Sequence, residues 1–195
     1  MNRVGVGRLL IASLHQGISD LIPTRLEFYE NWLHASGMRD GKIGLAPLAA
    51  VLSFLRQEGE SYELVTARAG QYAAQWSFDN LSSFERSMIR SLPVGLRPRI
   101  ALQLTKRVVR RSYLGARATS KLRKGQGTIT LRRSIFCGVR EPCSRPLCGY
   151  YAAALERSLT LVSANGRVTV RSCQGAGAGA CVIALNVLPE QEPQP

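Results

Sequence analysis

The sequence predicts an α+β fold, with N-terminal helices packed on an antiparallel sheet of about four to five strands in a single domain. Two observations lead to this prediction. Apolar residues recur at helical spacing through the first half of the chain, whereas short alternating segments separated by Gly-containing turns follow in the second half. The chain has 195 residues, of which 45% are hydrophobic and 20% are charged. This length and composition are typical of one globular domain with its own core.

The first sixty residues are predicted to form helices. Apolar residues three or four positions apart predict a helix over residues 6–21, which a proline ends. Thr24 and Glu27 are spaced as in a capping box and predict a second helix that runs to Gly37. A third helix is expected over residues 45–59.

After residue 60, the spacing of the apolar residues changes. Residues 61–67 alternate and include β-branched side chains, which predicts a strand. An irregular helical region follows, and then a strongly amphipathic helix over residues 96–113. The elements expected after it are strands 118–123 and 128–133 joined as a hairpin, a helix over 146–161, and strands 167–171 and 181–187.

These elements divide the chain into three parts: an N-terminal helical segment over residues 1–59, a core over residues 60–188, and a polar, Pro-rich tail over 189–195. The tail is expected to be disordered.

The Gly-rich sequence QGAGAGA, which begins at Gln174, has two interpretations. A phosphate-binding loop needs a strand before it and a helix after it, so that the helix N-terminus faces the anion. The segment that follows, CVIALNV, has the pattern of a strand. A connection between two strands is therefore the favoured interpretation.

Five cysteines are concentrated in the last third of the chain. No secretory signal is evident and no apolar run reaches the ~20 residues of a membrane span, so a cytoplasmic protein with reduced thiols is expected. Metal binding, redox chemistry and simple burial all remain open for these thiols. None of the cysteines forms a CxxC pair. A nucleophilic cysteine is disfavoured because His15 and His34 lie far away in the sequence.

The net charge of +13 makes this a basic protein, and the charge is unevenly distributed. Residues 97–145 contain fourteen basic residues and one acidic residue, Glu141, so this window carries the whole excess. Such a concentration indicates an acidic protein, an anionic lipid or a nucleic acid as partner, or else a solvated basic face. Tyr113 is the one aromatic residue between positions 97 and 133, which argues against base stacking. The candidate anion-binding residues are Arg107, Arg110, Arg111, Lys121, Arg123, Lys124, Arg132 and Arg133.

The second half of the chain also resembles a known family. The motifs are SIFC, LCGYYAAALERSL, and a strand that ends in Cys173 with Cys181 after seven further residues. They are similar to the 4-vinyl reductase domain family, which includes a bacteriochlorophyll-biosynthesis protein and phenol sensors, and more distantly to TRAPP-type vesicle-tethering subunits. The resemblance implies helices on an antiparallel sheet, dimerisation through the N-terminal helices to give a homodimer, and a pocket for a small hydrophobic molecule.

The resemblance also implies site residues. Cys148, Cys173 and Cys181 fall on the zinc-binding cysteines of the phenol sensors, whereas the glutamate position is occupied by Val170. Cys143 is the fourth candidate ligand, with Cys137 and Glu141 as alternatives. The expected ligand pocket is lined by Trp76, Leu104, Phe136, Tyr150 and Tyr151.

The favoured functional hypothesis is non-enzymatic binding of a small hydrophobic or aromatic ligand, in a sensor, carrier or assembly module, with a tetrapyrrole as one candidate and zinc as the candidate cofactor. One alternative is an adaptor that docks through its basic face. Another is an accessory protein in pigment vinyl reduction. A self-contained enzyme is disfavoured, because the sequence has no nucleotide-binding fingerprint and no evident acid–base pair.

Overall fold

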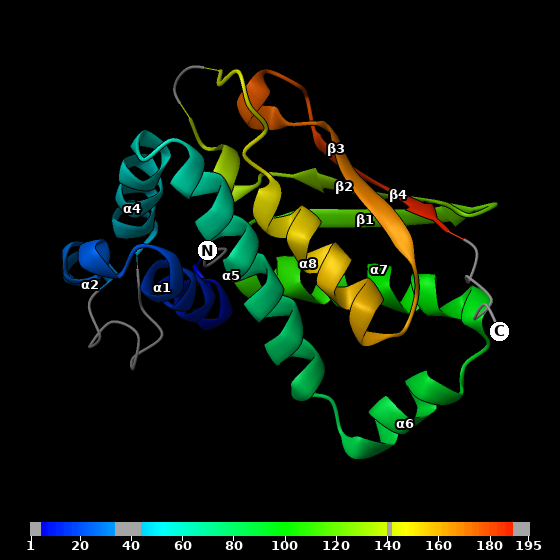
Figure 1. Ribbon diagram of the computed structural model, residues 1–195. Coiled ribbons are helices and arrows are strands. Elements are labelled where there is room, and N and C mark those ends of the chain that lie inside the picture. The colour runs from blue at the N-terminus through cyan, green and yellow to red at the C-terminus, as the bar shows by residue number, and fades with distance from the viewer. Residues whose placement is uncertain (1–4, 34–43, 140–141, 189–195) are drawn as a thin grey trace, which may run out of the picture.

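The computed structural model describes residues 5–33, 44–139 and 142–188. In this part of the chain, seven α-helices pack with one antiparallel sheet of four strands (Figure 1). The predicted α+β class is therefore confirmed. Among the described residues, no helix is long and apolar enough to cross a membrane.

The N-terminal part forms α1 (Arg8–Leu21), α2 (Leu26–Leu33) and α4 (Leu45–Gln57). These helices begin close to the predicted positions, and α1 and α4 bury apolar residues at helical spacing, such as Leu10 and Leu14 in α1 and Leu48 and Leu52 in α4. A short 3-10 turn, η1 (Pro23–Arg25), precedes α2 directly, so Thr24 lies within a turn. The predicted end of the second helix, at Gly37, lies outside the described residues.

The predicted strand over residues 61–67 is wrong, because this segment begins the longest helix, α5 (Glu60–Asp79). The buried residues of α5 recur at helical spacing, as with Tyr62, Val65 and Ala69. Alternation over seven residues cannot distinguish such a stripe from a strand, and packing against α1 and α8 decides the outcome. Gly70 permits this packing, since a Cβ atom there would clash with the carbonyl oxygen of Tyr150.

Two further helices follow α5. The first, α6 (Ser83–Ser91), starts with a capping box formed by Ser82 and Glu85. The 3-10 turn η2 (Val94–Leu96) leads into α7 (Arg97–Ser112), which confirms the predicted amphipathic helix. Figure 1 shows α6 at the opposite end of the molecule from the sheet.

The sheet contains β1 (Arg117–Arg123), β2 (Gln126–Arg132), β3 (Gly166–Ser172) and β4 (Cys181–Val187), in the order β1-β2-β4-β3. Both predicted hairpins are confirmed, and α8 (Gly149–Leu161) connects them. Lys124 and Gly125 have positive φ angles of 47° and 73° in the first turn, a conformation that favours glycine. The Gly-rich segment joins β3 to β4 through the 3-10 turn η4 (Gln174–Ala176), as the favoured interpretation expects.

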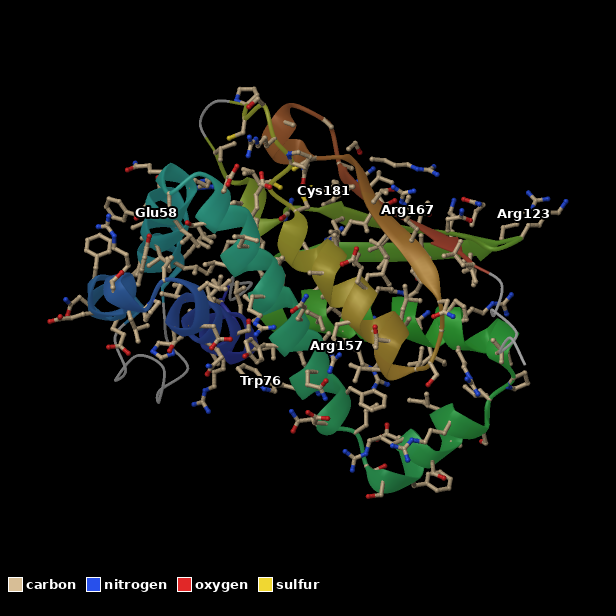
Figure 2. All side chains as sticks on the ribbon, viewed as in Figure 1. Glu58, Trp76, Arg123, Arg157, Arg167 and Cys181 are labelled. Atoms are coloured by element: carbon tan, nitrogen blue, oxygen red, sulfur yellow. The ribbon has the colours of Figure 1, made fainter. Side chains whose placement is uncertain are left out.

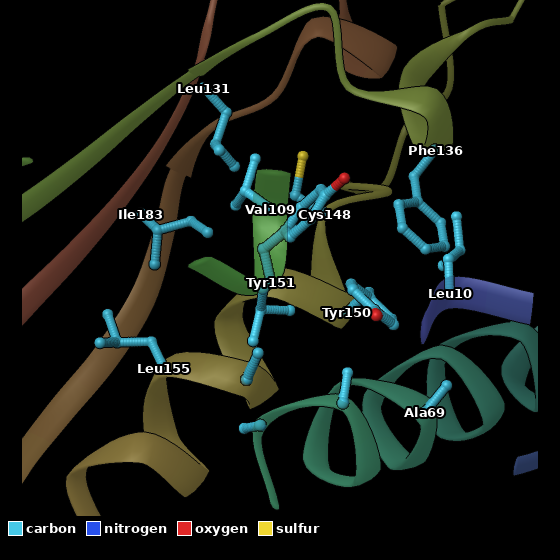
Figure 3. Close-up of a cluster of buried hydrophobic side chains, with 14 of the residues drawn as sticks. Leu10, Ala69, Val109, Leu131, Phe136, Cys148, Tyr150, Tyr151, Leu155 and Ile183 are labelled. Atoms are coloured by element: carbon cyan, nitrogen blue, oxygen red, sulfur yellow. The ribbon is translucent and has the colours of Figure 1, made fainter. Parts of the chain in front are cut away.

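The two faces of the sheet differ in their surroundings. Ile129, Leu131, Ile183 and Leu185 are buried on the inner face, on the side of α7 and α8. Figure 3 shows the centre of the core that they join, with Leu10 of α1 and Ala69 of α5 on its far side. One hydrophobic core thus includes residues from both the N-terminal segment and the sheet. The outer face of the sheet carries the charged residues of the strands.

Candidate metal centre

Four cysteines meet at one end of the sheet. Cys137 ends the 3-10 turn η3 (Ile135–Cys137), and Cys148 is the N-cap residue of α8. Cys173 directly follows β3, and Cys181 is the first residue of β4. Their Sγ atoms all lie within 4.8 Å of one another. The fold therefore collects thiols from segments up to 44 residues apart in the sequence.

The distances in this cluster suit a tetrahedral ion. The Sγ atom of Cys137 lies 3.3 Å from that of Cys148 and 3.4 Å from those of Cys173 and Cys181. The Sγ atoms of Cys148 and Cys173 are 3.3 Å apart. Zinc–thiolate bonds of about 2.3 Å place tetrahedral sulfurs about 3.8 Å apart, so a small expansion of the cluster would admit the ion. The distances far exceed the about 2.05 Å of a disulfide bond, and all four cysteines are free.

Backbone groups support negative charge on two of the sulfurs. The N–H of Leu147 donates to the Sγ atom of Cys173 at 3.2 Å, and the N–H of Gln174 donates to that of Cys181 at 3.3 Å. Such N–H···S bonds orient thiolate ligands and stabilise their charge.

The four thiols of the cluster differ in the direction of their pKa shifts. Hydrogen bonds from its neighbours, first from Cys148, lower the pKa of Cys137 to about 7. Hydrogen bonds from the other three thiols, first from Cys137, also lower the pKa of Cys173. The pKa values of Cys148 and Cys181 are raised, chiefly by their hydrogen bonds with Cys137. Four thiolates this close cannot coexist without a cation, so a bound divalent ion would replace the shared protons.

Helices α4 and α5 hold the cysteine loops in place. The hydroxyl of Tyr62 donates to the carbonyl oxygen of Leu147 at 3.1 Å, next to Cys148. Arg56 donates to the carbonyl oxygen of Phe136 at 3.3 Å, next to Cys137. The centre is therefore braced from the helical layer as well as from the sheet.

The predicted ligands are partly brought together. Cys148, Cys173 and Cys181 lie in the group, and the fourth position belongs to Cys137 instead of Cys143. The backbone N–H of Cys143 instead donates to the carbonyl oxygen of Gly175. Val170 is a β3 residue paired with Ile183 and contributes no ligand atom, and Glu141 lies outside the described residues. The spacing of the cysteines did not single out Cys137 as a metal ligand. Its position after Ile135 and Phe136 is equally typical of a small buried apolar residue.

The predicted pocket residues fall into three places. Phe136, Tyr150 and Tyr151 are fully buried and contact one another, with the rings of Phe136 and Tyr150 stacked at 4.8 Å (Figure 3). Leu104 lies on α7, and the ring of Trp76 stacks on Tyr72 on the outer side of α5 (Figure 2). The aromatic trio thus forms part of the packed core.

The hydroxyl groups of the two tyrosines in this trio differ in their hydrogen bonds. The Tyr150 hydroxyl lies 3.0 Å from the hydroxyl of Ser112 and 3.3 Å from that of Ser13, which links α8 to α7 and α1. The Tyr151 hydroxyl is buried and has no hydrogen-bond partner among the described residues. Burial raises the pKa of both tyrosines, that of Tyr150 to about 12, so both rings stay neutral.

In the described part of the chain, clefts lie outside the aromatic trio, and one of about 300 Å³ borders the cysteine loops at Tyr62, Cys143 and Leu147. One of about 330 Å³ is polar and lies between α5 and α8, with Arg68 and Arg157 among its lining residues. Another, of about 250 Å³, is an apolar groove between α6 and α7, lined chiefly by Leu81, Met88, Ile89, Ile100 and Leu104. The groove includes one residue of the predicted ligand set, Leu104.

The predicted basic residues are all exposed and come from α7 and the β1–β2 hairpin. Arg107, Arg110 and Arg111 lie on α7. Lys121 and Arg123 lie on β1, Lys124 in the following turn, and Arg132 and Arg133 at the end of β2.

Comparison with known proteins identifies similar folds. The chain is similar to the H-NOX domain of Shewanella oneidensis in its Fe(II)CO state, with a TM-score of 0.51, 13% identity, and coverage of 95% of this chain and 99% of that chain. It is also similar to the Fe(II) unliganded H-NOX protein of K. algicida, with a TM-score of 0.53, 11% identity, and coverage of 96% and 100%. No family model and no curated protein matches the sequence. The similarity establishes a shared fold.

This finding corrects the resemblance inferred from sequence. The structural neighbours are H-NOX domains, and the assignment to 4-vinyl reductase domains and TRAPP-type subunits is wrong. The sequence motifs misled because they reflect a local arrangement, in which two cysteines flank the connection between two strands beside a helix. Such an arrangement follows from packing four thiols together and does not identify a family. The link to bacteriochlorophyll biosynthesis has no support once the family assignment is removed.

Proposed function

We propose that this chain is a non-enzymatic binding module whose sheet and helical layer are joined by a four-thiolate zinc centre. The observation that supports this proposal is the convergence of the Sγ atoms of Cys137, Cys148, Cys173 and Cys181 within 4.8 Å. Borderline-soft Zn²⁺ prefers four thiolates in tetrahedral geometry. The same donors suit a single iron ion, so the identity of the metal is part of the test.

The donor set indicates a structural role. Four protein ligands complete the tetrahedron and leave no open position for water or substrate, unlike catalytic zinc sites with three protein ligands. Metal binding would join η3, the start of α8 and the connection between β3 and β4. Because the unfolded chain cannot present these ligands together, the binding free energy of the metal becomes folding free energy.

The H-NOX fold also implies haem iron, and the described interior does not fit that group. Haem iron is held by an axial His, Cys, Met or Tyr side chain. His15 lies on the outer side of α1 and is bonded to Glu30 at 2.7 Å. The buried Cys and Tyr side chains are already engaged in packing: Tyr150 and Tyr151 belong to the hydrophobic core, and the four thiols contact one another. We therefore assign no role to haem.

Metal content and spectroscopy test the proposal. The chain should purify with one zinc ion, and replacement by Co²⁺ should give the intense absorption of tetrahedral tetrathiolate cobalt. Removal of the ion by a chelator should lower the melting temperature by several degrees or more. The same protein mixed with hemin should show no stoichiometric, axially ligated complex. Absence of a tightly bound metal, or a stoichiometric hemin complex, would contradict the proposal.

A second function, binding of a small apolar ligand, is favoured by the groove between α6 and α7. Its volume of about 250 Å³ approaches the lower end of ligand sites, and Met88 on its wall is 53% exposed. Glu85 and Arg107 border an otherwise mostly apolar lining. A small apolar ligand with one polar end suits this arrangement.

ANS fluorescence tests the groove, because this dye brightens on apolar surfaces. Titration into the native protein should give saturable enhancement, and Met88→Glu should abolish it without changing the metal content. Phe84→Glu is the matched control, since Phe84 is a 73% exposed residue of α6 outside the groove lining. Equal effects of the two variants would argue against a site in the groove.

A further inference from the structure

The outer face of the sheet has a distinctive composition. Strand register places five cationic residues on it: Arg117, Lys121 and Arg123 of β1, Arg132 of β2, and Arg167 of β3. The exposed Arg171 follows on β3, at the register irregularity between Val170 and Ser172, and is the sixth cation. We call this surface the cationic face. The uncharged residues of this face are Thr119, Gln126, Thr128, Thr130, Thr169, Ser172, Val182, Ala184 and Asn186. Among the described residues of these strands, this face carries no aspartate or glutamate.

The cationic face is not neutralised from within the molecule. All six cations are exposed, and within residues 5–33, 44–139 and 142–188 none of them forms an ion pair. Arg117 and Arg132 are directly opposite each other in the register of β1 and β2. Like charges in opposed positions destabilise a sheet, so this pair lowers the stability of the fold. The arrangement therefore suits an external anion better than internal packing.

The cations are concentrated on the two edge strands. In the order β1-β2-β4-β3, five of the six lie on β1 and β3, and the uncharged floor lies on β2 and β4. Strands about 4.8 Å apart place the two rows about 14 Å from each other. This separation matches two phosphate backbones on either side of a duplex groove, which is about 12 Å wide in B-DNA. Figure 2 shows Arg123 and Arg167 on these two edges.

The chemistry of the face also distinguishes among anionic partners. Side chains that contact phosphate and sugar oxygens in nucleic-acid complexes include those found on this face, namely Arg, Lys, Thr, Asn and Gln. Single strands are usually bound by stacking on aromatic side chains, and the cationic face has none. Amphipathic elements that insert into a membrane surface place large apolar side chains beside the cations, whereas the floor of this face offers only Val182 and Ala184. Double-stranded nucleic acid is therefore the partner that would contact the cations of both β1 and β3.

We infer that the cationic face binds the sugar–phosphate backbone of double-stranded nucleic acid independently of base sequence, with β1 and β3 each contacting one strand. The β3 cations were not among the basic residues expected from the sequence, because Arg167 and Arg171 lie outside the window of high charge. This inference does not depend on the metal centre or on the apolar groove.

Fluorescence anisotropy with the full chain and a labelled DNA duplex of about 20 base pairs tests the inference over a range of KCl concentrations. Six phosphate contacts predict a slope of log K against log [KCl] of about −5, with a dissociation constant on the order of 10⁻⁵ M at physiological salt. The double variant Arg167→Gln/Arg171→Gln should make this slope shallower by about 2. The double variant Arg90→Gln/Arg99→Gln removes the same charge from α6 and the start of α7 and should leave the slope unchanged. Circular dichroism confirms that each variant is folded.

The competing partners give distinct results. A single strand of the same length, poly-L-glutamate, and vesicles of phosphatidylcholine with phosphatidylserine should each bind more weakly than the duplex at equal salt. Tighter binding of any of these three ligands would overturn the inference. So would equal losses in the two double variants, or no duplex binding at low salt.

Discussion

The cysteine centre and the cationic face lie on the same sheet but have opposite effects on the stability of the fold. At the cysteine centre, four thiols from distant segments are buried and held by backbone N–H groups and by two helices. On the cationic face, like charges are exposed and lack partners among the described residues. The comparison indicates that the first region contributes to folding, whereas the second costs stability that only a partner would recover.

The largest expected effect is at the cysteine centre. Cys148→Ser should remove one ligand and leave a buried hydroxyl among three thiols, because Cys148 is 0% exposed. We expect the metal to be lost and the free energy of unfolding to fall by roughly 3–5 kcal/mol. Urea denaturation with and without added Zn²⁺ measures this loss. Unchanged stability in both conditions would show that the centre contributes nothing to folding.

An intermediate effect is expected in the aromatic trio beside the centre. Tyr150→Phe should cost about 1–2 kcal/mol, since it removes the hydrogen-bond partner of the buried Ser112 hydroxyl. Tyr151→Phe is the matched control, because its buried hydroxyl has no partner in the described part of the chain. It should be neutral or slightly stabilising. Thermal denaturation of the two variants gives the comparison, and an equal loss in both would contradict the assigned hydrogen bonds.

The smallest expected effect has the opposite sign and occurs on the cationic face. Arg117→Thr should relieve the repulsion with Arg132 and raise the free energy of unfolding by about 0.5 kcal/mol at low salt. Salt screens exposed charges, so the gain should shrink as the KCl concentration rises. The same variant should weaken duplex binding. If Arg117→Thr destabilised the protein at low salt, the face would not be a source of internal repulsion.

Local patterns predicted much of the fold. The stripes of α1, α4 and α7 and the alternation of all four strands gave elements close to the observed ones, since each pattern reports burial of one side. Alternation failed at residues 61–67, where tertiary packing against α1 and α8 selects a helix. The distribution of charge along the sequence also missed part of the cationic face, because strand register brings Arg167 of β3 onto the same face as the cations of β1.

The candidate site was less predictable. Three ligands were expected from the family resemblance, and the same three converge in the structure although the family itself was wrong. The choice between Cys137 and Cys143 depends on the path of the loop after β2, which no spacing rule specifies. Burial of Phe136, Tyr150 and Tyr151 could be anticipated, but whether they line a pocket or fill it depends on the close approach of α5 to α8 at Gly70.

The most direct test of the central claim is the zinc content of three proteins by native mass spectrometry: the unmodified chain, Cys137→Ser and Cys143→Ser. The four-thiolate centre predicts one zinc ion in the unmodified chain and in Cys143→Ser, and its loss or strong weakening in Cys137→Ser. No zinc in the unmodified chain, or loss in Cys143→Ser with retention in Cys137→Ser, would contradict it.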